Sequence, residues 1–225
     1  MKSFPLLQAL AWSFAAVLAA RGASPLRSPL TPEQSVAALK VEPGMKVELV
    51  AAEPLVIAPV AIAFDDKGRM YVAEGRGYPD EIGEGKPALG RIALLEDTDG
   101  DGRFDRRSEF AVDLPFPCGV LPWRGGVFVA SAPDILYLKD TDGDGRADVR
   151  TVVLTGFDAQ KRSTQHFVNS PVLGLDNWIY LSDGVGGVSK VRSPQHPERA
   201  AVESSGHDWR FRPDTLEVEA VSGYG

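Results

Sequence analysis

A nine-residue acidic motif occurs twice in this chain and constrains its fold more than any other feature. Residues 97–105 read Asp-Thr-Asp-Gly-Asp-Gly-Arg-Phe-Asp, and residues 140–148 read Asp-Thr-Asp-Gly-Asp-Gly-Arg-Ala-Asp. Short runs of apolar residues flank both copies, which lie 43 residues apart. A repeat with this period and these flanks indicates a chain built from similar units of short β-strands.

Each copy of the motif carries four aspartates, at positions 1, 3, 5 and 9. Close carboxylates repel one another, whereas calcium takes about six to eight oxygen ligands and would turn that repulsion into binding. The glycine at position 6 allows a sharp turn, and the main-chain carbonyl at position 7 would add a ligand. The predicted calcium ligands are therefore Asp97, Asp99, Asp101, Arg103 and Asp105 in the first loop and Asp140, Asp142, Asp144, Arg146 and Asp148 in the second.

These loops are not EF-hands, because position 12 holds Ser108 and Thr151 in place of the bidentate glutamate. The flanking residues also follow a strand pattern and not that of amphipathic helices. We therefore predict structural calcium sites in strand-to-strand turns. The alternative is a pair of metal-free hairpin turns, since Asp and Gly are also the residues that tight turns use.

The N-terminus has the pattern of a secretory signal peptide over residues 1–23, with Lys2 followed by an apolar run from Phe4 to Ala20. An uncleaved anchor is the alternative. Cleavage would remove Lys2 and Arg21 and no acidic residue, so the formal charge would fall from −7 to −9. Such an acidic chain is a poor ligand for nucleic acid. We expect an exported protein, in the periplasm or outside the cell, with no transmembrane span in its mature form.

The rest of the chain predicts a short helix followed by an all-β domain. Residues 24–44 read as a linker and a helix from Pro32 to Lys40, with Thr31 and Gln34 forming a capping box. Residues 45–225 then carry short strands, about four in every 45 to 55 residues, which is typical of propeller blades. The strand predictions include residues 46–50, 187–192 and 217–221.

We therefore predict a partial β-propeller, with an irregular β-sandwich as the alternative. The expected blades are residues 56–112, 117–155 and 169–212, with the start of a fourth at 216–225. Propellers normally close with about four to eight blades, so we expect part of a longer protein. The one cysteine, Cys118, excludes an internal disulfide and a zinc cluster of cysteines.

The loop before the third blade holds the candidate catalytic residue, His166, with Asn169 close behind it. Histidine titrates near neutral pH and can take a proton from an alcohol as general base. Arg76 follows a second strand on the same face and could hold an anion. The alternatives are a structural histidine for His166 and a surface ion pair for Arg76.

The spacing from His166 to Gly174, Asp176 and the Ile179-Tyr180 pair resembles the soluble quinoprotein glucose and sorbosone dehydrogenases. That resemblance implies a six-bladed propeller that binds calcium and pyrroloquinoline quinone. It also implies that His166 takes the sugar hydroxyl proton. Our own hypothesis adds Arg76 and Asn169 near the quinone or the substrate.

A closer resemblance is to a membrane-bound dehydrogenase family of planctomycetes and verrucomicrobia, and it extends from about residue 32 to residue 225. The segments that carry it include residues 47–54, 114–117, 132–136, 175–180 and 211–214, together with both acidic motifs. The resemblance implies a sugar or alcohol substrate and electron transfer to a haem-binding domain elsewhere in longer members.

Three hypotheses of function remain open at this stage. The first is a fragment of an exported quinoprotein-type dehydrogenase. The second is a non-catalytic, calcium-stabilised propeller that binds glycan or protein. The third is a metal-dependent hydrolase of the lactonase kind, which would use Glu74, Asn169 and Asp183 around one ion.

Overall fold

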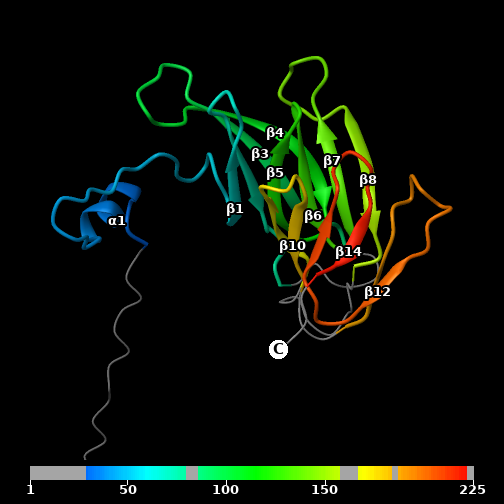
Figure 1. The fold of residues 1–225 in the computed structure, drawn as a ribbon. Coiled ribbons are helices and arrows are strands. Elements are labelled where there is room, and N and C mark those ends of the chain that lie inside the picture. Colours follow the sequence, from blue (N-terminus) through cyan, green and yellow to red (C-terminus); the bar gives the residue numbers. More distant parts are fainter. Residues whose placement is uncertain (1–28, 80–85, 158–166, 184–186, 222–225) are drawn as a thin grey trace, which may run out of the picture.

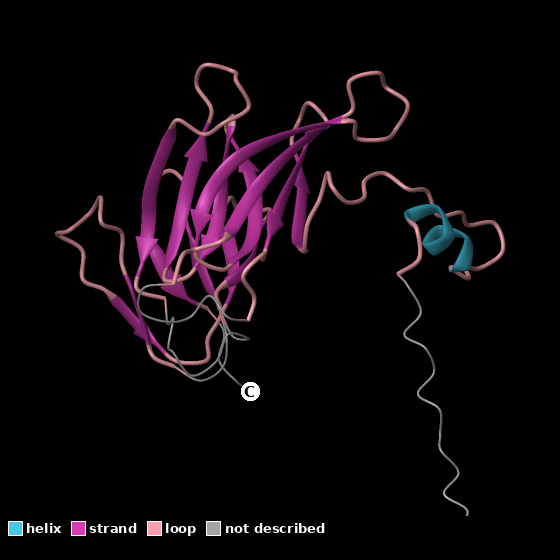
Figure 2. Cartoon of the chain, turned by 180° about the vertical axis from the view of Figure 1, so that it is seen from behind, coloured by secondary structure: helices cyan, strands magenta, loops and turns pink. Residues whose placement is uncertain are grey.

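The computed structural model describes residues 29–79, 86–157, 167–183 and 187–221. Within these ranges the chain forms one short helix and fourteen strands, most of which belong to three antiparallel sheets of four strands each (Figures 1 and 2). The predicted all-β class is confirmed.

Sheets A and B each use four consecutive strands in sequential order. The strands of sheet A are β1 (Pro59–Phe64), β2 (Met70–Glu74), β3 (Gly90–Glu96) and β4 (Arg106–Leu114). The strands of sheet B are β5 (Pro117–Trp123), β6 (Gly126–Ser131), β7 (Asp134–Lys139) and β8 (Val149–Thr155). The strands of sheet C are β9 (Asn169–Leu173), β10 (Ile179–Ser182), β13 (Trp209–Phe211) and β14 (Val218–Ala220).

The first strands of the three sheets lie next to one another, because β1 contacts β5 and β5 contacts β9. The later strands of each sheet follow outward from this common side. Antiparallel four-stranded sheets whose first strands lie side by side, and which pack face to face, are the blades of a β-propeller. The predicted partial propeller is therefore confirmed.

Buried aromatic side chains join neighbouring sheets. Tyr71 of sheet A lies edge-on to Phe110, at 5.0 Å between ring centroids, within a cluster that includes residues of sheet B. Between sheets B and C, Phe128 meets Phe211 edge-on at 5.4 Å. Truncating a buried aromatic residue to alanine typically costs about 3–5 kcal/mol. The cluster around Tyr71 and the Phe128–Phe211 contact therefore contribute strongly to holding the blades together.

The structure revises the predicted strands of the third blade. The sequence pattern predicts that residues 217–221 begin a fourth blade, but β14 pairs with β13 and completes sheet C. It also predicts that residues 187–192 supply the third strand of this blade, but β11 (Ser189–Val191) pairs instead with β12 (Val202–Ser204). Strand patterning indicates that a segment is extended, but it does not say which partner the segment finds.

The hairpin of β11 and β12 is an insertion that reaches the outer edge of sheet B. Thr155 of β8 and Arg192 exchange main-chain hydrogen bonds of 2.9 and 3.0 Å, and Lys190 N–H donates to the carbonyl of Gly156. An edge strand presents unpaired N–H and C=O groups, and the insertion occupies some of them. The third blade thus supplies a cover for the second.

Two predictions for the N-terminal region have different outcomes. Helix α1 (Pro32–Ala38) begins with the expected capping box, in which Gln34 N–H donates to Thr31 Oγ1 at 3.2 Å. It ends two residues before Lys40. The predicted strand at 46–50 does not form, because its alternating residues have no neighbouring strand to pair with among the residues that the structure describes.

No helix within the described ranges is long and apolar enough to cross a membrane. The predicted signal peptide, residues 1–23, lies outside those ranges. Export therefore stays a prediction.

Candidate functional site

The two acidic motifs form loops at equivalent places in consecutive sheets. Loop 1 (residues 97–105) joins β3 to β4, and loop 2 (residues 140–148) joins β7 to β8. Figure 1 shows them as the green and yellow-green loops that project from the same edge of the sheets. Both are turns between a third and a fourth strand, as the sequence predicts.

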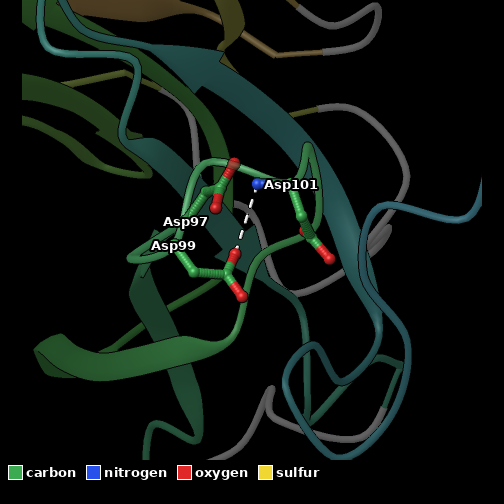
Figure 3. A group of neighbouring side chains, drawn as sticks. All are labelled: Asp97, Asp99 and Asp101. Carbon is green, nitrogen blue, oxygen red and sulfur yellow. Dashed lines mark hydrogen bonds between the residues drawn. The ribbon is translucent and has the colours of Figure 1, made fainter.

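The side chains of loop 1 bind its own backbone. The carboxylate of Asp97 accepts hydrogen bonds from the N–H groups of Gly100 at 2.7 Å and Gly102 at 2.9 Å. Asp99 Oδ1 accepts from the N–H of Asp101 at 3.2 Å, the bond drawn in Figure 3. These bonds wrap the loop around the three carboxylates.

Loop 2 repeats this arrangement. Asp140 accepts from the N–H groups of Gly143 at 2.7 Å and Gly145 at 2.9 Å, and Asp142 Oδ1 accepts from the N–H of Asp144 at 3.2 Å. The same nine-residue pattern therefore gives the same loop in two different surroundings.

Each loop gathers three of its four aspartates. One oxygen from each of Asp97, Asp99 and Asp101 lies within 4.8 Å of the other two, and the corresponding residues of loop 2 form a matching group. Hydrogen bonds from the N–H groups of Gly102 and Gly100 lower the pKa of Asp97 below its usual value. Three clustered carboxylates are a donor set that suits a hard cation such as calcium.

Asp140 of loop 2 also has a lowered pKa. Burial acts to raise it, but the N–H groups of Gly145 and Gly143 outweigh that effect. The first aspartate of both loops is therefore held in its ionised form at neutral pH, the form that binds a metal.

The fourth aspartate of each loop lies outside the group of three and bonds to a threonine. Asp105 accepts hydrogen bonds from Thr98, at 3.2 Å from the main-chain N–H and 2.7 Å from the hydroxyl. Asp148 binds Thr141 in the same way. Neither belongs to the group of three. The bonds between the threonine at position 2 and the aspartate at position 9 join the two ends of each loop. This threonine, present in both motifs, is the sequence signal for them.

The position-7 arginines also take part in closing the loops. Arg103 N–H donates to Asp101 Oδ1 at 2.8 Å, and Arg146 N–H donates to Asp144 Oδ1 at the same distance. The metal-ligand roles predicted for these two residues and for the fourth aspartates stay predictions.

The predicted redox residues are not brought together within the described ranges. His166 lies outside them. Asn169 opens β9, and its amide donates to the carbonyl of Phe167 at 2.8 Å. Arg76 follows β2 of sheet A, whereas Asn169 belongs to sheet C. The cofactor-binding roles of Arg76 and Asn169 stay predictions.

Arg76 belongs to a buried ion cluster that the sequence did not reveal. Its guanidinium binds Glu74 Oε2 at 2.8 Å, and Glu74 has an exposed fraction of 0%. Arg107 binds the same carboxylate through two nitrogens, at 2.7 and 3.1 Å. Two guanidinium groups thus offset the charge of Glu74, which does not favour the predicted lactonase role of this residue. Arg76 is itself paired with Glu74, so less of its positive charge is left to bind an anion.

The cluster fastens the N-terminal segment to sheet A. The N–H of Ile57 donates to Glu74 Oε1 at 2.9 Å, and Arg107 donates to the carbonyl of Leu55. Glu109 binds both Arg107 and Arg91. Burial acts to raise the pKa of Glu109, but hydrogen bonds from Arg91 and Arg107 bring it below its usual value. A glutamate at the end of an apolar strand was the available signal for this cluster.

The motif that follows His166 forms a turn between β9 and β10. Gly174 N–H donates to the carbonyl of Trp178 at 2.8 Å, and the hydroxyl of Tyr180 donates to Asp176 at 2.9 Å. This turn lies on the edge that carries the Asp loops, whereas His166 precedes the opposite end of β9. Gly174, Asp176 and Tyr180 thus have a structural part in the motif.

Three solved structures illustrate what the chain is similar to. The calcium structure of a Trichoderma reesei carbohydrate-active enzyme of family AA12 has a TM-score of 0.49 and 16% identity over 75% of this chain and 38% of its own. The holo form of the pyranose dehydrogenase PQQ domain from Coprinopsis cinerea has a TM-score of 0.49 and 16% identity over 74% and 38%. An oxidoreductase described as a glucose dehydrogenase from Thermus thermophilus has a TM-score of 0.45 and 20% identity over 71% and 45%.

The chain thus spans less than half the length of each of these three proteins. No curated protein matches it. A family model described as a domain of unknown function, DUF7133, matches residues 31–225, which include all three sheets and both Asp loops. The chain belongs to the DUF7133 family.

Proposed function

We propose that this chain is a calcium-binding part of an exported β-propeller of the quinoprotein sugar- or alcohol-dehydrogenase type. The observation that carries the calcium part is the repeated loop: two consecutive sheets present the same group of three carboxylates, held by the same hydrogen bonds. One such loop could be an ordinary turn, but two identical carboxylate groups at one edge favour the same kind of ligand, one ion in each loop.

The role proposed for calcium is structural. Phe104 N–H, in loop 1, donates to the carbonyl of Val50, and Ala147 N–H, in loop 2, donates to the carbonyl of Phe110. Each loop therefore holds a neighbouring part of the chain. An ion that binds only the folded loop stabilises these attachments by mass action.

The redox part of the proposal rests on the resemblance around His166, supported by the position of Asn169 at the start of the innermost strand β9. We propose that His166 is the base that accepts a hydroxyl proton from the sugar or alcohol. Because the described residues do not assemble a site from Arg76 and Asn169, we assign no step to pyrroloquinoline quinone. Quinone binding is therefore the first property to measure.

Equilibrium dialysis against calcium, followed by metal analysis, tests the calcium part. We expect two ions per chain, and one ion in Asp99→Asn and in Asp142→Asn. Glu203→Gln, which removes an exposed carboxylate from the β11–β12 hairpin, is the matched control and should retain two. A chain that binds no calcium would overturn this part.

The redox part is tested by titrating the chain with pyrroloquinoline quinone and following tryptophan fluorescence. Dye reduction with aldoses and simple alcohols then tests for turnover, with His166→Ala expected to remove it. Absence of both quinone binding and dye reduction would refute the redox assignment while leaving the calcium result intact.

Export and the electron acceptor belong to the same proposal. Cleavage near residue 23 would be seen by sequencing the N-terminus of the secreted protein. Transfer of electrons to a haem domain would be seen as haem reduction when the substrate is added to a longer family member.

A further inference from the structure

A cleft of about 410 Å³ lies between sheets B and C on the edge that carries the Asp loops. Its walls come from β6, β7 and β8, from the β5–β6 and β13–β14 turns, and from the segment after β11. This edge is opposite the end of β9 that follows His166. None of the described residues that line the cleft belongs to the proposed redox set of His166, Asn169 and Arg76.

The floor of the cleft is apolar and fixed in place. Phe128, Val153 and Leu216 are buried there. The ring of Tyr137 packs against Phe128 at 5.2 Å, and its hydroxyl donates to the carbonyl of Trp123 at 3.1 Å. Most small-molecule sites combine such a preformed apolar surface with a few polar groups.

The mouth of the cleft carries one ion pair that joins the two blades. Arg124 Nη1 of the β5–β6 turn lies 2.6 Å from Asp214 Oδ1 of the β13–β14 turn. The two side chains are 67% and 56% exposed, and an ion pair this exposed contributes only about 0–1 kcal/mol to stability. The pair thus offers hydrogen-bonding groups at the mouth that a ligand can share at little cost to the fold.

The remaining polar lining is balanced in charge. Gln195 is neutral, and Nδ1 of His196 lies 3.1 Å from the carboxylate of Glu198. Arg124 and Asp214 offset each other. The lining residues thus offer both donors and acceptors, and the charge of Arg124 is matched by that of Asp214, which disfavours strongly charged ligands and suits a neutral one.

We propose that this cleft binds one neutral sugar ring. A pyranose has C–H groups that can lie on the aromatic and aliphatic floor and hydroxyls that can meet Arg124, Asp214 and Gln195 at the mouth. The volume is within the usual range of about 300–1,000 Å³ for small-molecule sites. This inference goes beyond the proposed function and does not depend on it.

Saturation-transfer NMR on the 225-residue chain tests the proposal, with D-glucose, D-galactose, D-mannose and D-xylose as probes. Glucose 6-phosphate and glucosamine serve as charged analogues. We expect saturation transfer to at least one neutral sugar and weaker transfer to its charged analogues. Asp214→Asn removes a charged acceptor, so it should weaken binding by about tenfold or more.

The matched control is Glu203→Gln, because Glu203 forms an equally exposed ion pair with Lys190 outside the cleft. It should leave sugar binding unchanged. Absence of transfer to every neutral sugar at millimolar concentrations would overturn the proposal, as would equal weakening in both variants. Loss of binding in His166→Ala but not in Asp214→Asn would assign the sugar to the proposed redox residue in place of the cleft, and would also overturn the proposal.

Discussion

The two Asp loops share their internal structure but are held by different neighbours. In loop 1, the N–H of Phe104 donates to the carbonyl of Val50 at 2.9 Å, so the loop holds the N-terminal segment. In loop 2, the equivalent N–H of Ala147 donates to the carbonyl of Phe110 at 2.8 Å, so the loop holds sheet A against sheet B. The motif determines the shape of the loop, and its surroundings determine what that shape stabilises.

The glycine at position 6 shows the same contrast. Gly102 and Gly145 have φ angles of +88° and +85°, which glycine adopts most readily. Gly102 is exposed, and a Cβ placed on it would meet no atom within 4 Å. Gly145 is buried, and a Cβ there would lie 2.7 Å from the hydroxyl oxygen of Ser108. Loop 2 is therefore packed into the junction between the blades, whereas loop 1 is open at this point.

The largest expected effect comes from Glu74→Gln. This substitution loosens the N-terminal segment that the Glu74 cluster holds, and loop 1, but not loop 2, bonds to that segment. Removing one partner of a buried ion pair typically costs about 3–5 kcal/mol, and Arg107 and Arg76 would keep only the half-buried Glu109 as a counter-charge. Urea unfolding should show that loss. Hydrogen exchange should show the Phe104 amide losing more protection than the Ala147 amide.

Glu203→Gln is the control for Glu74→Gln, because it breaks an exposed pair and should change stability by about 0–1 kcal/mol. Equal loss of protection at Phe104 and Ala147 would contradict the idea that the ion cluster acts on loop 1 alone.

Next in size is the difference between Gly145→Ala and Gly102→Ala. Both substitutions place a side chain at positive φ, at about 1–2 kcal/mol each. Gly145→Ala also forces a contact with Ser108, and overpacking adds about 1–3 kcal/mol. Thermal or urea unfolding should therefore show the larger loss for loop 2.

Adding Ser108→Gly to Gly145→Ala should recover the extra loss, because it removes the atoms that the new methyl group meets. The same addition to Gly102→Ala should recover nothing. Equal costs for the two alanine variants would show that the loops do not differ in packing.

Calcium should stabilise both loops, and the difference in stabilisation between loop 1 and loop 2 should be smaller than the difference between the two glycine variants. At a free concentration about one hundred times the Kd, a single site adds about 2.7 kcal/mol. Calorimetry in calcium and in chelator should show Asp142→Asn losing more of this stabilisation than Asp99→Asn, because the more closely packed loop 2 loses less freedom when the ion binds and should have the lower Kd. A larger loss in Asp99→Asn would reverse the assignment.

The smallest expected effect is a loss of stability in acid. The pKa of Glu109 lies below its ordinary value of 4.5 in the folded chain, so its contribution is present above that pH and disappears as the pH falls through the lower, folded value. The Tm should be flat near neutrality and should fall by a few degrees below about pH 4.5. Glu109→Gln should have a lower Tm at neutral pH and less additional loss in acid.

Much of the fold followed from local patterns. The apolar runs around the two motifs predicted the strands of sheets A and B, and Thr31 with Gln34 predicted the start of α1. The motif itself predicted the converging carboxylates, because spacing along a nine-residue loop is a local property.

The parts that the sequence did not predict depend on partners distant along the chain. Residues 46–50 alternate like a strand but find no neighbouring strand in the described part of the chain, and residues 189–191 are a strand in a different sheet from the one expected. The ion pair of Glu74 and Arg107 joins residues 33 positions apart, so the local pattern around Glu74 does not identify its partner. The predicted role of His166 rests on the sequence alone, since that residue lies outside the described ranges.

The insertion that pairs with the end of β8 has a practical consequence for dividing this protein into pieces. A chain cut after sheet B would keep all four strands of its second blade and still lose the segment that covers the outermost one. The bared edge could then pair with another molecule, which makes aggregation the expected behaviour of such a piece. The natural unit for expression therefore extends past residue 204, and blade boundaries alone are a poor guide to where the protein can be shortened.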